Sequence, residues 1–107
     1  MSGIIMGNAR SITIMQATVD LGSVAANTSE EETATVPGVQ AGDIVIVRKP
    51  TLEAGIVIAD ARVSAADTVT MQVINSTGSA VDAASETMDF VIIRPETTGD
   101  YPGEVIS

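Results

Sequence analysis

The sequence predicts an all-β protein, a small β-sandwich, from three observations. Short runs of β-branched and aliphatic residues recur along the chain, turn residues separate these runs, and helical periodicity is absent from them. The chain has 107 residues, a length typical of a single domain. These patterns do not specify strand order, so jelly-roll-like and immunoglobulin-like connectivities both stay open.

Six strands are expected, each ended by Gly, Pro or a polar turn. They cover residues 17–21, 31–36, 44–47, 56–63, 68–75 and 87–94. In 68–75, Val69, Met71 and Val73 alternate with polar residues, so this run and 56–63 predict a β-hairpin joined by a short loop. Residues 75–85 are rich in Gly, Ser and Ala and are expected to form an irregular connection.

The domain is expected to cover residues 15–95. Residues 1–14 mix apolar residues with glycine and predict an extended N-terminal arm outside the core. Residues 96–107 are expected to be a polar C-terminal tail. An arm of this kind would contact another molecule, because free termini are ordered only when something holds them.

The core must be built from aliphatic residues, because Phe90 and Tyr101 are the only aromatic residues in the chain. Residues 44–47, 56–63 and 87–94 are apolar on both faces, whereas a strand with one solvated face alternates. The second face should therefore be covered, either by a neighbouring subunit or by an arm or loop of the same chain. The first alternative predicts a homo-oligomer, preferably a trimer. Its interface would contain Ile56, Ile58, Val91 and Ile93.

Composition argues against several classes of function. The net charge is −9 and the five basic residues are scattered, so we expect no nucleic-acid partner and no membrane partner. The chain has no His and no Cys, which removes the commonest general base, thiol nucleophile and metal ligands. We therefore expect no catalytic residues, no metal and no cofactor, and classify the protein as a non-enzyme. The N-terminus lacks a signal-peptide pattern, so synthesis and residence in a cytoplasm are expected.

Three short motifs have simpler interpretations than a site. The acidic run 29–32 is interpreted as a solvated charge cluster, because consecutive strand residues point to opposite faces and suit calcium poorly. The same interpretation applies to the acids of 82–89. The sequons at 27–29 and 75–77 are interpreted as turn residues.

Three segments carry a family resemblance: "TVPGVQAGDIVIVRKP", "GIVIADARVSAADTVTMQVIN" and "FVIIRP". They resemble the head decoration, or cement, proteins of tailed bacteriophages, over about residues 35–95. The resemblance implies a β-sandwich that forms trimers on the outer capsid surface of the virion and binds the major capsid protein. Its role would be to stabilise contacts between capsid subunits after synthesis in the host cytoplasm.

Two alternatives stay open, another virion module such as a head fibre base or tail β-sandwich, and a bacterial adhesion or carbohydrate-binding module. If the protein is a decoration protein, the mostly apolar arm is the expected capsid contact. The residues proposed for it are Ile4, Ile5, Met6 and Arg10.

Overall fold

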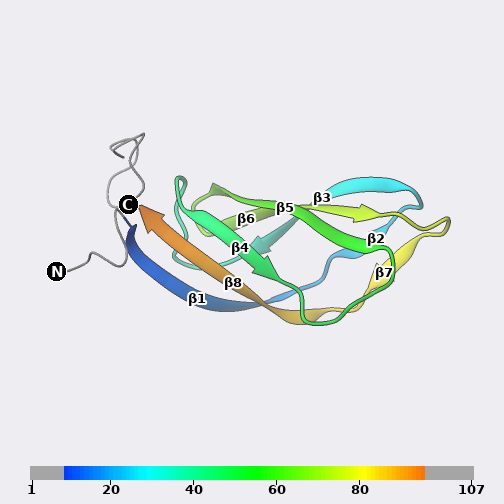
Figure 1. The fold of residues 1–107 in the computed structure, drawn as a ribbon, viewed down its shortest axis with the longest axis horizontal. Coiled ribbons are helices and arrows are strands. Elements are labelled where there is room, and N and C mark those ends of the chain that lie inside the picture. Colours follow the sequence, from blue (N-terminus) through cyan, green and yellow to red (C-terminus); the bar gives the residue numbers. More distant parts are fainter. Residues whose placement is uncertain (1–8, 96–107) are drawn as a thin grey trace, which may run out of the picture.

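A computed structural model describes residues 9–95, which form two packed antiparallel sheets and a short two-stranded ribbon (Figure 1). The all-β prediction is confirmed: the described residues contain eight strands and no helix. The strands are β1 Ala9–Val19, β2 Gly22–Val24, β3 Thr28–Thr35, β4 Ile44–Arg48, β5 Ile56–Ala65, β6 Thr68–Asn75, β7 Val81–Ala83 and β8 Glu86–Pro95.

The first sheet has the order β1-β8-β4 and the second the order β3-β6-β5. Strands β2 and β7 pair with each other and continue the β1–β8 ladder beyond a short break, because Val19 pairs with Glu86 and Gly22 pairs with Ala83. Of these pairs, only β5 and β6 are consecutive in the chain, and they form the predicted hairpin. Every other pairing joins distant segments, so the strand order could not be predicted from local patterns.

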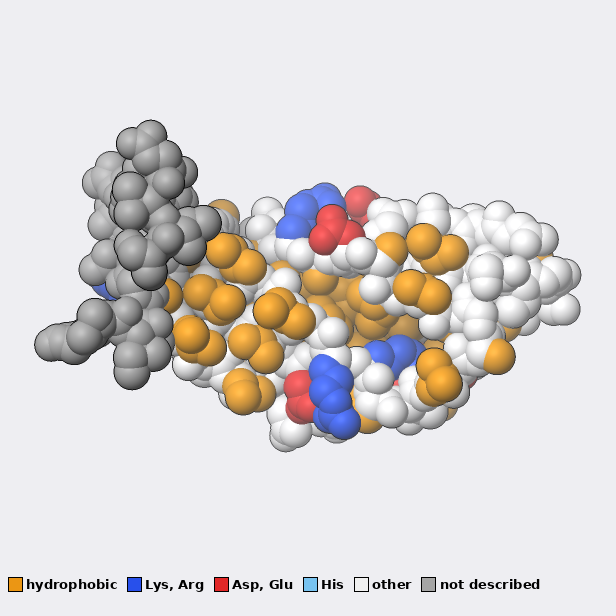
Figure 2. Space-filling view, in the orientation of Figure 1, with side chains coloured by type: hydrophobic (Ala, Val, Ile, Leu, Met, Phe, Trp, Pro, Cys, Tyr) orange, Lys and Arg blue, Asp and Glu red, His pale blue; other side chains and the backbone are white. Residues whose placement is uncertain are grey.

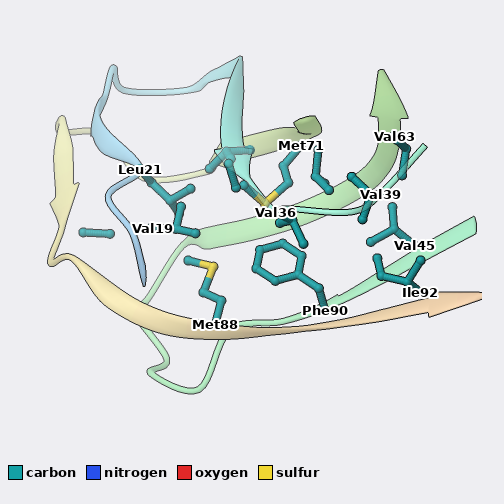
Figure 3. Close-up of a cluster of buried hydrophobic side chains, with 14 of the residues drawn as sticks. Val19, Leu21, Val36, Val39, Val45, Val63, Met71, Met88, Phe90 and Ile92 are labelled. Carbon is teal, nitrogen blue, oxygen red and sulfur yellow. The ribbon is translucent and has the colours of Figure 1, made fainter. Parts of the chain in front are cut away.

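Alternation along β8 and β6 builds the core between the two sheets. Met88, Phe90 and Ile92 point from β8 toward the other layer, where Phe90 lies beside Val36 and below Met71 (Figure 3). Val69 and Val73 are also fully buried, as their alternation predicts. Phe90 is the only described aromatic residue in this core, and aliphatic side chains fill the remaining space.

The arm boundary predicted at residue 14 is wrong, because residues 9–14 belong to strand β1. Pairing with β8 runs from Ala9 opposite Pro95 to Val19 opposite Glu86. In β1 the isoleucines lie on the outer side of the sheet and polar residues such as Thr13 lie on the inner side. This is the reverse of the usual pattern, in which apolar residues face the core, so the segment resembled an arm. Residues 1–8, with Ile4, Ile5 and Met6, and the tail 96–107 lie outside the described residues.

The structure differs from the sequence-based prediction in two other places, where a strand is too short or too irregular to give a recognisable alternation of apolar and polar residues. The connection 75–85 contains the three-residue strand β7. In β5, the pairing with β6 is irregular between Ile58 and Asp60. A bulge of this kind adds one residue and changes which side chains face inward.

The bulge in β5 places Ile56 and Val63 in the same core, although strict alternation would put them on opposite faces. Ile56 is buried, and Ile58 packs against the core as a partly buried residue. The expected role of Ile56 and Ile58 in an oligomer interface is therefore wrong: their side chains are used inside the sandwich.

Candidate functional site: an aliphatic sheet face

The outer surface of sheet β1-β8-β4 carries two adjacent rows of aliphatic side chains. Strand pairing places Ile12 opposite Ile93 and Ile93 opposite Ile44, and the next outward row follows the same order. We call this surface the isoleucine face. Its six residues are Ile12, Ile14, Ile44, Ile46, Val91 and Ile93.

These side chains are unusually exposed for their type. Ile14 is 71% exposed and Ile46 is 56% exposed, while Val91 and Ile93 on the central strand are half-buried between their neighbours. Hydrophobic side chains gather over the part of the molecule where Figure 1 draws β1, β8 and β4 (Figure 2). Single exposed aliphatic residues are common, but a contiguous patch on a folded protein marks an interaction surface.

A polar row borders the isoleucine face at one end. Asp89 accepts a hydrogen bond from Gln16 at 2.9 Å on one side and from Arg48 at 2.7 Å on the other. The Gln16 bond, followed by the Arg48 bond, lowers the pKa of the Asp89 carboxyl below its ordinary value. The Asp89 carboxylate thus has its hydrogen-bonding partners within the sheet. This polar row forms one border of the isoleucine face.

The outer surface of the other sheet is mostly polar, although one row contains Ile74 and the exposed Val57. There Glu31 lies opposite Gln72 and Gln72 opposite Asp60, and the next row contains Thr33, Thr70 and Arg62. Glu31 and Arg62 form an exposed ion pair at 3.6 Å. One sheet therefore has the alternation of a solvated strand surface, whereas the other is apolar on both sides.

The structure brings together only part of the predicted interface. Val91 and Ile93 lie at the centre of the isoleucine face. Their place in an oligomer interface stays a prediction. Arg10, expected in the capsid contact, is exposed near the start of β1. Sequence reasoning missed Ile12 and Ile14 as interface candidates, although their spacing of two carried the signal.

Two ionic clusters hold the ends of the first sheet and its adjoining loops. Arg94 binds Asp43 through two hydrogen bonds of 3.0 and 2.8 Å and also donates to the carbonyl oxygen of Gly38. Lys49 pairs with Glu86 at 2.7 Å and with Glu53. Burial of Lys49 opposes its charge, but the hydrogen bonds to both glutamates outweigh burial and raise its pKa.

These basic groups are therefore engaged in structural contacts. Arg94 also lines a pocket of 180 Å³ between β1 and the turn at 37–39, together with Ser11 and Thr13. Its guanidinium is held by Asp43 and Gly38, so this pocket offers hydroxyl groups and aliphatic walls and not a free cation.

The sequon at 75–77 is a structural element. The Asn75 side chain is fully buried, and its amide nitrogen donates to the carbonyl oxygens of Val24 and Ser79, both at 2.9 Å. Asn27, in the other sequon, has a positive φ of 50° in the turn before β3. The turn prediction holds for Asn27, whereas Thr28 and Ser29 already belong to β3, and Asn75 ends strand β6 with the bend following it.

The acidic run 29–32 lies on strand β3, with side chains pointing to alternate faces. Burial, followed by the charges of Glu30 and Asp20, raises the pKa of Glu32. Among residues 9–95, no three acidic side chains are grouped in a way that could hold a metal ion. The same residues include no helix long and apolar enough to cross a membrane.

Comparisons with protein-family models, with curated proteins and with solved structures found no match to this chain.

Proposed function

We propose that this protein is a non-enzymatic capsid decoration protein, which binds the outer surface of a tailed-phage head and stabilises contacts between major capsid protein subunits. The observation that carries the proposal is the isoleucine face, because an exposed aliphatic patch of this kind indicates a protein that functions by binding other protein surfaces. The sequence resemblance over residues 35–95 is the reason for proposing a phage head as the assembly to which the protein binds.

Several features of the fold suit such a role. The two sheets share one aliphatic core, and charged residues of the first sheet pair with residues of its own loops and strand ends. Strand β1 begins at Ala9 and strand β8 ends at Pro95, and these two residues pair, so both lie at the same end of the sandwich. Arg10 is exposed at this end, where the proposed capsid contact lies.

The proposal predicts that the protein binds assembled heads better than free capsid subunits and stabilises the shell by mass action. The test uses heads of the phage that carries this gene, produced without the protein. Purified protein is added, bound copies are counted by gel densitometry and electron microscopy, and the rupture temperature of the heads is measured. We expect saturable binding of hundreds of copies per head and a higher rupture temperature.

A deletion and one substitution, with a control on the other sheet, test the residues proposed for the capsid contact. Removal of residues 1–8 leaves β1 intact, because that strand begins at Ala9, and should abolish head binding while circular dichroism stays that of a β-protein. Arg10→Ala should weaken binding, and Arg62→Ala, on the other sheet, serves as its control. A low, fixed copy number per virion would contradict decoration and favour a tail or fibre module.

A further inference from the structure

We propose that the isoleucine face is covered by the same face of a second copy, so that two β1-β8-β4 sheets pack face to face around a two-fold axis. The partner at this interface would be the protein itself, and the dimer would form before the protein binds a capsid. Only the biological purpose of the dimer rests on the proposed function.

The first argument is self-complementarity. The two rows contain Ile12, Ile93 and Ile44, and Ile14, Val91 and Ile46, so both present three aliphatic side chains across three strands. No charged or hydrogen-bonding side chain lies within these rows. A second copy therefore meets aliphatic groups with aliphatic groups, and no polar group loses water without a partner.

Area gives the second argument. Four isoleucines that are more than half exposed, with two half-buried neighbours, make a patch of roughly 400 Å², in the range of functional patches on monomers. Two patches face to face would bury roughly 800 Å², and part of the rim would bring the total to the roughly 1,000 Å² that a biological interface should reach, so we expect a weak, concentration-dependent dimer. Face-to-face packing of two sheets through aliphatic side chains is also how the core of this sandwich is built.

Charge supplies the third argument. Two copies that each carry a net charge of −9 repel one another, so they should approach through a surface without excess acid. Strands β1, β4 and β8 contain only two acids, and both are paired, Asp89 with Arg48 and Glu86 with Lys49. The other sheet presents Glu31 and Asp60 instead.

Symmetry distinguishes a dimer from the trimer that the sequence favoured. A two-fold axis brings the same patch of both copies together, whereas a three-fold ring needs two different complementary surfaces on each copy. The described residues present one continuous aliphatic face across three strands, and the outer surface of the other sheet is mostly polar. A single self-complementary face fits the two-fold arrangement.

The test measures the oligomeric state of the full chain by sedimentation at micromolar concentrations. We expect a dimer, whose dissociation constant rises at least tenfold in Ile14→Lys and in Ile46→Lys, because each change enters the interface twice. Val57→Lys is the control: Val57 is an exposed valine, 50% accessible, on strand β5 of the other sheet. It should leave the dissociation constant unchanged.

A second measurement avoids changes of charge. Because the chain has no cysteine, Val91→Cys introduces a single thiol at the centre of the face. Its labelling by a maleimide should slow at least tenfold as the protein concentration rises through the dissociation constant. Val57→Cys should label at one rate throughout.

The outcomes separate this proposal from the proposed function. A monomer at 100 micromolar, a trimer, or a dimer insensitive to both lysine variants would overturn the two-fold interface, even if the protein decorates heads. A dimer that depends on Ile14 and Ile46 but binds no heads would support the interface and reject the decoration role.

Discussion

Asn75 shows how one buried amide organises an entire loop. It donates to Val24 and Ser79 and accepts from the backbone N–H and the hydroxyl of Thr77, at 2.9 and 2.7 Å. The loop between β6 and β7 is thereby joined to the end of β2. A buried polar side chain is stable in this position because all of its hydrogen-bonding groups are satisfied.

Asn75→Ala should lower the free energy of unfolding by about 1–3 kcal/mol, because it leaves buried backbone groups without partners. Ser76→Ala is the matched control: its hydroxyl makes one exposed hydrogen bond to Gly55, and the change should be within about 0.5 kcal/mol. Urea unfolding of both variants measures the difference. Equal stability of the two variants would contradict the assigned role of Asn75.

Gly55 precedes β5 and makes a close approach to the same loop. Its φ is +84°, and a Cβ atom added there would collide with Cγ2 of Thr77. Thr77 cannot turn away freely, because its hydroxyl bonds to Asn75 and Ser79. The sequence showed a turn glycine here, but its contact partner comes from 22 residues later in the chain.

Gly55→Ala should destabilise the protein by about 1–2 kcal/mol from backbone conformation alone, with the collision adding to this value. Gly78→Ala, in the facing loop, is the control, since a Cβ there meets nothing within 4 Å. Thermal unfolding should show a lower midpoint for Gly55→Ala and a nearly unchanged midpoint for Gly78→Ala. The reverse order would show that the close approach is not formed.

At the scale of elements, ion pairs fix the ends of the strands in the first sheet and make its stability depend on pH. Hydrogen bonds from Arg94 lower the pKa of Asp43, and those from Lys49 lower the pKa of Glu86. Asp89 is shifted in the same direction by Gln16 and Arg48. A lowered pKa in the folded state means that the unfolded chain binds protons first as the pH falls.

Stability contributed by these carboxylates should be present above about pH 4, the range of unperturbed Asp and Glu, and decrease as the pH falls below it. The raised pKa of Glu32 acts in the opposite direction and offsets part of the loss. Thermal midpoints between pH 7 and pH 3 measure the sum. Because general charge repulsion also changes over this range, the informative quantity is the difference between variant and parent.

Asp43→Asn isolates one of these contributions. The Asp43 side chain is 3% exposed, so loss of its charge should lower the midpoint at pH 7 and give a shallower decrease between pH 5 and pH 3 than in the parent. The two curves should converge at low pH, where Asp43 of the parent is protonated. Parallel curves would mean that the Arg94–Asp43 contact does not contribute to acid sensitivity.

At the scale of the whole molecule, the two sheets share one core but present opposite outer surfaces. The second sheet carries Glu31, Asp60 and Arg62 toward water, whereas the first carries the isoleucine face. The acidic residues outside this face repel those of a second copy and so limit the directions of approach. The isoleucine face is then the surface at which two copies can associate with the least electrostatic repulsion.

Local patterns in the sequence determined the fold class, the β5–β6 hairpin, and the inward residues of β6 and β8. These properties depend on period-two alternation and turn chemistry, which act between residues close in the chain. The same alternation indicated that β4 and β8 had a second apolar face, and Val91 and Ile93 do lie on the outer side of the sheet. Their place in an oligomer interface stays a prediction.

Only the tertiary structure decided which strands share that face and which isoleucines are core. Pairing of β8 with β1 and β4 joins segments separated by more than 40 residues along the chain, and it brings Ile12, Ile14, Ile44 and Ile46 to one surface. The bulge in β5 moves Ile56 inward, although its local pattern resembles that of an exposed residue. Side-chain direction follows backbone register, and register is set by long-range hydrogen bonding and packing.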